Sequence, residues 1–164
     1  MAFNEINIKN GTSLNLVEYT FGCMTSYALC TCGIAPDEFM KLFLASGIAE
    51  QLEWANPKYV VGMSGMELAE LVFSKTGYVK ESETAPYCVE DKGPEFWAGE
   101  LLAWCQRRLG VRFEDILEKG MLLSEILALD VVQKSRDNKF MDILGVGLQF
   151  EKTMAEKMGR KEEE

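Results

Sequence analysis

Apolar residues recur along most of this chain every three or four positions, which is the spacing of an amphipathic α-helix. Residues 13–32 predict the first long helix, and Gly33 suits its C-terminal stop. The apolar stripe of this helix consists of Leu14, Val17, Phe21, Met24 and Ala28. Pro36-Asp37-Glu38 opens a second helix, with proline at the first helical position and acids near the positive end of the helix dipole.

Turn signals divide the following stretch into further helices. Ser46-Gly47 marks a break, and Asn56-Pro57 ends a third short helix, because the residue before a proline is pushed out of the helical region. Ser64 and Glu67 form a capping box, in which we expect the hydroxyl and the carboxylate each to bond a free amide at the helix start. The polar residues 78–92 follow that helix and predict the longest loop.

The clearest helix signal begins at Gly93-Pro94-Glu95 and ends at Gly110, with two arginines in its last turn. Trp97, Leu101 and Trp104 share one face of this segment. Large aromatic residues at this spacing are typical of a buried face. We therefore predict that this is the central helix of the core.

Two short helical patterns follow, and then a long one that runs from about Asp137 to Met158. The chain has no run with strand periodicity, no internal repeat and no linker that would divide it. It predicts an all-α, single-domain bundle of seven or eight short to medium helices. We expect residues 1–12 to form a flexible N-terminal arm, residues 13–158 the helical domain and residues 159–164 a charged C-terminal tail.

Composition limits what this chain can bind. Its 164 residues, 48% of them hydrophobic, suffice for one domain with an apolar core. The formal net charge of −9 has the wrong sign for binding phosphates, which argues against a nucleic-acid partner. We find neither a secretory signal nor an uninterrupted apolar run of about 18 residues, so we expect a cytoplasmic protein with no membrane segment.

The chain contains no histidine. This excludes Ser-His-Asp and Cys-His catalysis, metal sites with imidazole ligands and histidine acid–base chemistry. The five cysteines are an odd number, and we interpret them as small buried hydrophobic residues of a reducing compartment. Cys30-x-Cys32 is one residue short of the spacing that serves metal or redox sites. We therefore predict no metal and no cofactor.

Two patterns are similar to catalytic motifs and have simpler explanations. The first, Gly62-Met63-Ser64-Gly65, is close to a nucleophile elbow, but its second glycine is misplaced and helix capping explains the serine. The second is a pair of glutamates one helical turn apart, which occurs at Glu67 with Glu70 and at Glu114 with Glu118. Exposed helix faces carry many such pairs, so we interpret them as solvated and predict no catalytic residue.

The loop at residues 56–62 is the most specific in composition, because it presents an amide, a cation and a phenol between two helices. Asparagine and proline explain a turn there, yet loops also carry many binding residues. Each tryptophan of the central helix would anchor an interface if it were exposed. The predicted partner-binding residues are Asn56, Lys58, Tyr59, Glu95, Trp97 and Trp104.

Several blocks of the sequence stand out together: Phe43-Leu44-Ala45-Ser46-Gly47-Ile48-Ala49-Glu50-Gln51, Asn56-Pro57-Lys58-Tyr59, Gly62-Met63-Ser64-Gly65-Met66-Glu67-Leu68 and Gly93-Pro94-Glu95-Phe96-Trp97-Ala98-Gly99. They resemble a family of small uncharacterised all-helical proteins of gut anaerobic bacteria. Genes of that family often lie beside short genes suspected of toxin–antitoxin or immunity roles, and no activity is established for it. This chain departs from the family at Trp54-Ala55 and in its Met- and Lys-rich C-terminal helix.

The sequence thus favours a non-enzymatic interaction protein that acts as an antitoxin-like or regulatory partner of another small protein. It is also compatible with a homo-oligomer. One alternative is a helix-turn-helix DNA-binding regulator that uses residues 36–54. Against it, Glu50-Gln51-Leu52-Glu53 offers two acids and one glutamine where a recognition helix needs groups that read bases. The other alternative is an enzyme built on carboxylates or on a lone cysteine.

Overall fold

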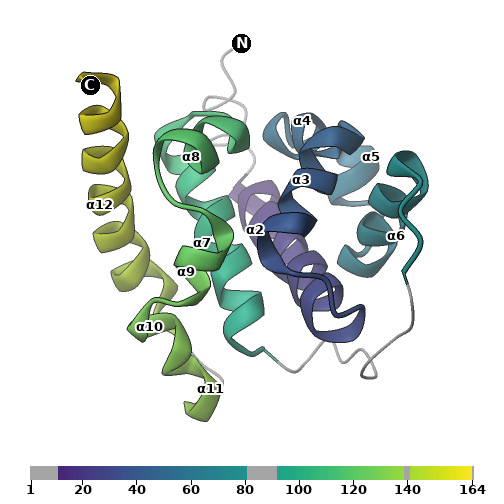
Figure 1. Ribbon diagram of the computed structural model, residues 1–164, viewed down its shortest axis with the longest axis horizontal. Helices are drawn as coiled ribbons and strands as arrows, with labels where there is room; N and C mark the ends of the chain where they lie inside the picture. The colour runs from purple at the N-terminus through teal and green to yellow at the C-terminus, as the bar shows by residue number, and fades with distance from the viewer. Residues whose placement is uncertain (1–10, 81–91, 139–140, 164) are drawn as a thin grey trace.

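The computed structural model describes residues 11–80, 92–138 and 141–163. Every regular element in these ranges is helical and no strand occurs in them, which confirms the predicted all-α fold. The longer helices are α2 (Gly11–Ser26), α3 (Pro36–Ser46), α6 (Gly65–Thr76), α7 (Pro94–Leu109), α8 (Phe113–Lys119) and α12 (Ile143–Glu163) (Figure 1). The shorter ones are α4 (Ile48–Glu53), α5 (Pro57–Val60), α9 (Leu123–Leu127), α10 (Asp130–Gln133), α11 (Ser135–Asn138) and a π-helix, η1 (Tyr27–Thr31).

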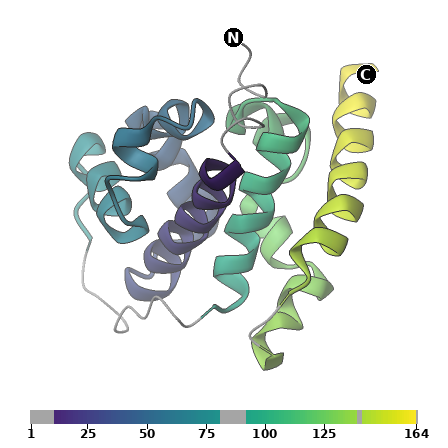
Figure 2. The ribbon, with the colours of Figure 1, turned by 180° about the vertical axis from the view of Figure 1, so that it is seen from behind.

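The helices α2 and α7 lie side by side at the centre of the domain (Figures 1 and 2). A Cβ added at Gly99 of α7 would lie 3.2 Å from the Cα of Gly22 in α2 and 2.6 Å from the Thr25 hydroxyl. The two backbones therefore meet where neither carries a side chain. The helix α6 packs on α2, and α12 packs on the far side of α7. The predicted central helix, α7, thus shares the centre with α2.

Three phenylalanines join the central pair to its neighbours. Phe21 of α2, Phe43 of α3 and Phe113 of α8 are fully buried. Their ring centroids lie 5.1 to 5.2 Å apart in each pairing. Aromatic rings at this separation add favourable contacts beyond the area that they bury. This cluster fixes the position of α8, whose start forms one wall of the pocket described below.

The sequence located most helix ends correctly. Proline occupies the first turn of α3, α5 and α7, and Gly47, Gly77 and Gly110 end helices in the left-handed conformation. At the start of α6 the Ser64 hydroxyl accepts the Glu67 amide at 3.1 Å, as predicted. The Glu67 carboxylate accepts from the Ser64 hydroxyl itself, at 3.2 Å, where we had expected it to bond the Ser64 amide.

The structure corrects several predicted boundaries. The first helix changes to a π-helix at Tyr27 rather than continuing to residue 32 as one α-helix. The loop at residues 56–62 contains the helical turn α5. The segment from Asp137 divides into the end of α11 and the start of α12, and α12 continues to Glu163 through the residues predicted as a charged tail. The predicted N-terminal arm and long loop lie largely outside the described residues.

The cysteines follow the predicted pattern with one correction. Cys23, Cys32 and Cys105 are buried, and burial raises the pKa of the Cys105 thiol to about 12. Cys30 is exposed, because the π-helical turn carries it to the surface, and Cys88 lies outside the described residues. Among the described helices, none has both the length and the apolar character required to cross a bilayer.

Charged side chains are buried along the α2–α7 contact. Glu18 of α2 is 3% exposed and pairs with Arg107 of α7. Burial raises the pKa of Glu18, and the guanidinium of Arg107 opposes that rise. Glu100, also on α7, is half-buried and has no ion-pair partner within residues 11–80, 92–138 and 141–163. Burial and the nearby Glu18 charge raise its pKa to about 7, while Lys92 acts in the opposite direction.

Gly99→Ala tests the close approach of α2 and α7. The added methyl group would collide with Thr25, so the helices must separate, which costs about 1–3 kcal/mol. Alanine regains up to about 1 kcal/mol of helix propensity, so we expect a net loss of stability in urea denaturation. Gly159→Ala is the matched control, because no atom lies within 4 Å of its added Cβ and it should stabilise α12. Equal stabilisation by both substitutions would contradict the close approach of α2 and α7 at Gly99.

Glu100→Gln tests this half-buried carboxyl through the pH dependence of stability. The pKa of Glu100 is about 7 in the folded protein and 4.5 when unperturbed, so the folded state binds the proton more tightly. The stability that the protonated carboxyl provides is complete below pH 4.5 and is lost as the pH rises through 7.

We therefore expect Glu100→Gln to change the free energy of unfolding little at pH 4.5. At pH 8 it should stabilise the protein by on the order of 1–3 kcal/mol. Urea denaturation at the two pH values measures both effects. Glu156→Gln, on the exposed face of α12, controls for the change in net charge. A Glu100→Gln effect that is equal at both pH values would contradict the raised pKa.

Candidate functional site

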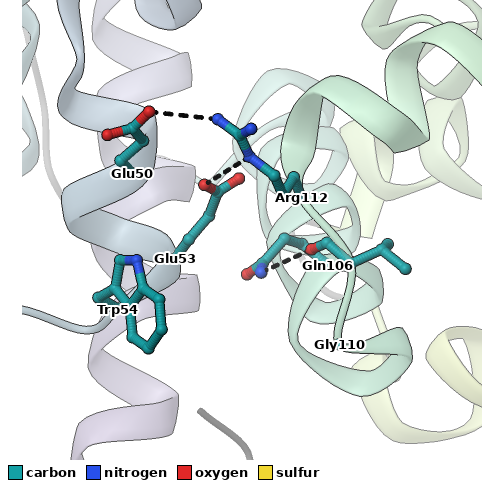
Figure 3. Close-up of a pocket in the computed structure, with 7 residues that line it drawn as sticks. Glu50, Glu53, Trp54, Gln106, Gly110 and Arg112 are labelled. Atoms are coloured by element: carbon teal, nitrogen blue, oxygen red, sulfur yellow. Dashed lines mark hydrogen bonds and ion pairs between the residues drawn. The ribbon is translucent and has the colours of Figure 1, made fainter. Parts of the chain in front are cut away.

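A pocket of about 470 Å³ lies between the C-terminal end of α4 and the turn that joins α7 to α8. Its walls are Glu50, Glu53, Trp54, Gln106, Gly110, Val111 and Arg112. Figure 3 shows the two carboxylates and Trp54 on the α4 side, facing Gln106 and Arg112 across the opening. The turn on the second side exists because Gly110 adopts φ +65° and ends α7.

The acidic side of the pocket is held by contacts to α8. Glu53 is 8% exposed, and its Oε2 accepts the backbone N–H of Phe113 at 2.7 Å. The guanidinium of Arg112 lies 3.7 Å from the other oxygen of Glu53 and 3.2 Å from the Glu50 carboxylate. Burial raises the pKa of Glu53, whereas the Phe113 amide and Arg112 lower it. One Glu53 oxygen thus remains directed at the pocket with only a distant partner.

Gln106 carries a hydrogen-bond acceptor without a donor. The residue is 2% exposed, and its amide nitrogen donates to the carbonyl of Val111 at 2.9 Å. Only the NH₂ group can donate, so this bond fixes which way the amide faces. Its Oε1 is buried and has no hydrogen-bond partner. Figure 3 shows this end of the side chain directed toward α4, into the space beside Glu53 and Trp54.

Trp54 supplies an exposed aromatic face. It follows α4 directly, lines the pocket and is 62% exposed. Ala55 after it has φ +50°, a left-handed conformation that costs a non-glycine residue roughly 1 kcal/mol. Hydrogen bonds from the Ala55 and Asn56 amides to the last turn of α4 maintain this conformation. Strain of this kind is concentrated at functional sites.

Among the predicted partner-binding residues, Asn56, Lys58 and Tyr59 lie on α5, just beyond Trp54. Asn56 has a structural role, because its side chain accepts from the Lys58 amide and donates to Gln51 at 2.8 Å. Lys58 is exposed and its ammonium lies 5.3 Å from the centre of the Tyr59 ring. These three residues border the candidate pocket without lining it.

The other predicted residues lie elsewhere. Trp97 and Trp104 are 6% and 8% exposed and belong to the core, so neither is an exposed interface anchor. Glu95 is in the first turn of α7, at the opposite end of that helix from the pocket. The predicted set is therefore not brought together.

Sequence reasoning missed Glu53, Gln106 and Arg112 as site residues. One signal was present: Glu53 is a charged residue one helical turn after Ala49, on a face of α4 that is buried. Of the helical carboxylate pairs, Glu67 and Glu70 line one shallow pocket, where each already has its own partner: Glu67 accepts from Ser64 at the helix start, and Glu70 accepts from Tyr27 and Lys80. Within the described part of the chain, no three histidine, cysteine, aspartate or glutamate side chains are grouped to hold a metal ion.

No known protein family, curated protein or solved structure matches this chain. The resemblance to small proteins of gut anaerobic bacteria therefore stays a prediction. The pocket itself is the basis for a functional interpretation.

Substitutions at Glu53 test how the pocket is held together. Glu53→Ala leaves the buried Phe113 amide without an acceptor, which should destabilise the protein by about 1–3 kcal/mol. Glu53→Gln keeps an acceptor oxygen for that amide and should cost less than half as much. Urea denaturation at pH 7 measures the difference. Equal losses for the two variants would show that this hydrogen bond does not support the site.

Proposed function

We propose that this protein is a non-enzymatic interaction protein that binds a basic segment of a partner protein in the pocket between α4 and the α7–α8 turn. The observation that carries the proposal is the buried Oε1 of Gln106, an acceptor with no donor, beside Glu53. An unsatisfied buried acceptor is unfavourable, and this one is closed off from solvent. A ligand that brings an N–H group therefore gains the missing hydrogen bond once a side-chain movement opens the space beside Glu53.

The charge of the chain supports a basic partner. Its formal net charge is −9, and Glu50 and Glu53 line the pocket. Complementary potentials accelerate encounter with a cationic protein and disfavour anionic ones. A small basic partner is also what an antitoxin-like or regulatory role would require, and such a role would place the pair in the cytoplasm.

The lining residues favour binding over catalysis. None of the seven carries a hydroxyl or thiol nucleophile, and both carboxylates face the guanidinium of Arg112. A DNA-reading role for α4 is not favoured either, since its acids Glu50 and Glu53 face the same guanidinium. Trp54 at the pocket mouth matches the residue type that most often anchors protein interfaces.

Fluorescence-labelled peptides of defined charge test the proposal. We expect basic peptides to bind the intact protein with an affinity that falls with added salt, and acidic or neutral peptides of equal length not to bind. Trp54→Ala should weaken binding by about tenfold or more without unfolding the protein, because the indole is exposed.

Leu144→Ala is the matched control, since it shortens an equally exposed apolar residue on α12, away from the pocket. Binding of basic peptides that is unaffected by Trp54→Ala would place the interaction elsewhere. Absence of binding by every basic peptide at low salt would reject the function.

A further inference from the structure

We infer that the pocket accepts a guanidinium group, that of an arginine side chain on the partner protein, and that this group takes the place of the protein's own Arg112. This inference rests on the function proposed above and specifies the chemical group that it recognises. Three features of the pocket point to a guanidinium: the spacing of its carboxylates, the position of its free acceptor and the flat face of Trp54.

The two carboxylates already bind one guanidinium. Arg112 reaches Glu50 through Nη2 at 3.2 Å and Glu53 through Nε at 3.7 Å, so the acids are spaced for two edges of a single planar cation. Both distances exceed the roughly 2.7–2.9 Å of a strong charge-assisted hydrogen bond. The Arg112 side chain is also 57% exposed, and exposed ion pairs contribute little. The resident cation is therefore held weakly and can be exchanged.

A second guanidinium would find one contact that Arg112 does not make and could shorten another. Gln106 has its unpartnered Oε1 in the same pocket, and Arg112 reaches the Glu53 oxygen that the Phe113 amide leaves unused only at 3.7 Å. Five N–H groups in one plane can serve both acceptors at once, which the compact ammonium of lysine does less well. The indole of Trp54 offers a face on which a guanidinium can stack.

The same geometry favours arginine within a protein over the free amino acid. Free arginine carries an α-carboxylate, which Glu50 and Glu53 would repel, and an α-ammonium group. Both charges would lose hydration beside the pocket, whereas a peptide chain carries neither of them there. Trp54 lines the pocket and is 62% exposed, so the backbone of a partner that contacts it would lie at the protein surface.

Titration of the intact protein, followed by amide chemical shifts in NMR, tests the inference. The probes are N-acetyl-arginine amide, the corresponding lysine compound, the uncharged citrulline compound and free arginine. We expect the arginine compound to bind at least about tenfold more tightly than the lysine compound, and the other two to bind more weakly than either. The shifts should concentrate at Trp54, Gln106 and the start of α8.

Two arginine variants test whether the ligand replaces Arg112 or is only attracted by the charge of the protein. Arg112→Gln removes the competing guanidinium and should tighten binding of the arginine compound by about tenfold. Arg108→Gln is the matched control, because Arg108 is similarly exposed and pairs with Glu151 outside the pocket, and it should leave the affinity unchanged. Circular dichroism shows that each variant is folded.

Equal binding of the lysine and arginine compounds would overturn the preference for guanidinium. Weaker binding by Arg112→Gln would overturn the exchange, since Arg112 would then contact the ligand directly. If basic peptides still require Trp54 in either case, the proposed function stands and only this inference fails. If no basic peptide binds at all, both are rejected.

Discussion

The contact between α2 and α7 is the constraint on which the rest of this structure depends. The helices approach so closely at Gly22 and Gly99 that an added Cβ on Gly22 would lie 3.0 Å from the Phe96 carbonyl oxygen. Glycine allows a similarly close approach at two neighbouring helix contacts. Gly65 brings the first turn of α6 against the backbone of α2, and Gly147 brings α12 against the Trp104 ring. Glycine therefore sets the spacing of three successive helix contacts.

The pocket follows from that central pair. The helix α7 ends at Gly110, and the chain must then place Phe113 against Phe21 and Phe43 in the core. This requirement fixes the Phe113 amide where Glu53 accepts it and leaves Arg112, one residue earlier, at the surface. The polar walls of the site are thus positioned by apolar packing. A binding site built on packed helices keeps its geometry better than one on loops.

Local signals allowed the helix ends to be predicted, whereas the site could not be. A proline at the first helical position or a glycine at the last acts within a few residues, so Pro36 and Gly110 could be interpreted from their neighbours alone. Glu53 and Gln106 become site residues only because the fold brings α4 and α7 to the same pocket. No local sequence pattern encodes that arrangement. Asn56 was predicted to bind a partner because of its place in a loop, but its side chain bonds Gln51 and the Lys58 amide, which are close in sequence.

Four departures from local rules lie around this pocket. Ala55 holds a left-handed conformation, Glu53 of α4 is buried, Gln106 of α7 has an amide oxygen without a donor, and Trp54 faces solvent. Other departures lie elsewhere, at the buried Glu18 and at the unpartnered indole nitrogens of Trp97 and Trp104. Each is individually unfavourable, and selection for stability alone removes such features readily. Natural sequences are otherwise locally consistent, so clustered violations mark the places where function opposes stability. What sets this pocket apart is that a buried carboxylate and an amide oxygen without a donor, Glu53 and Gln106, line the same space from opposite walls.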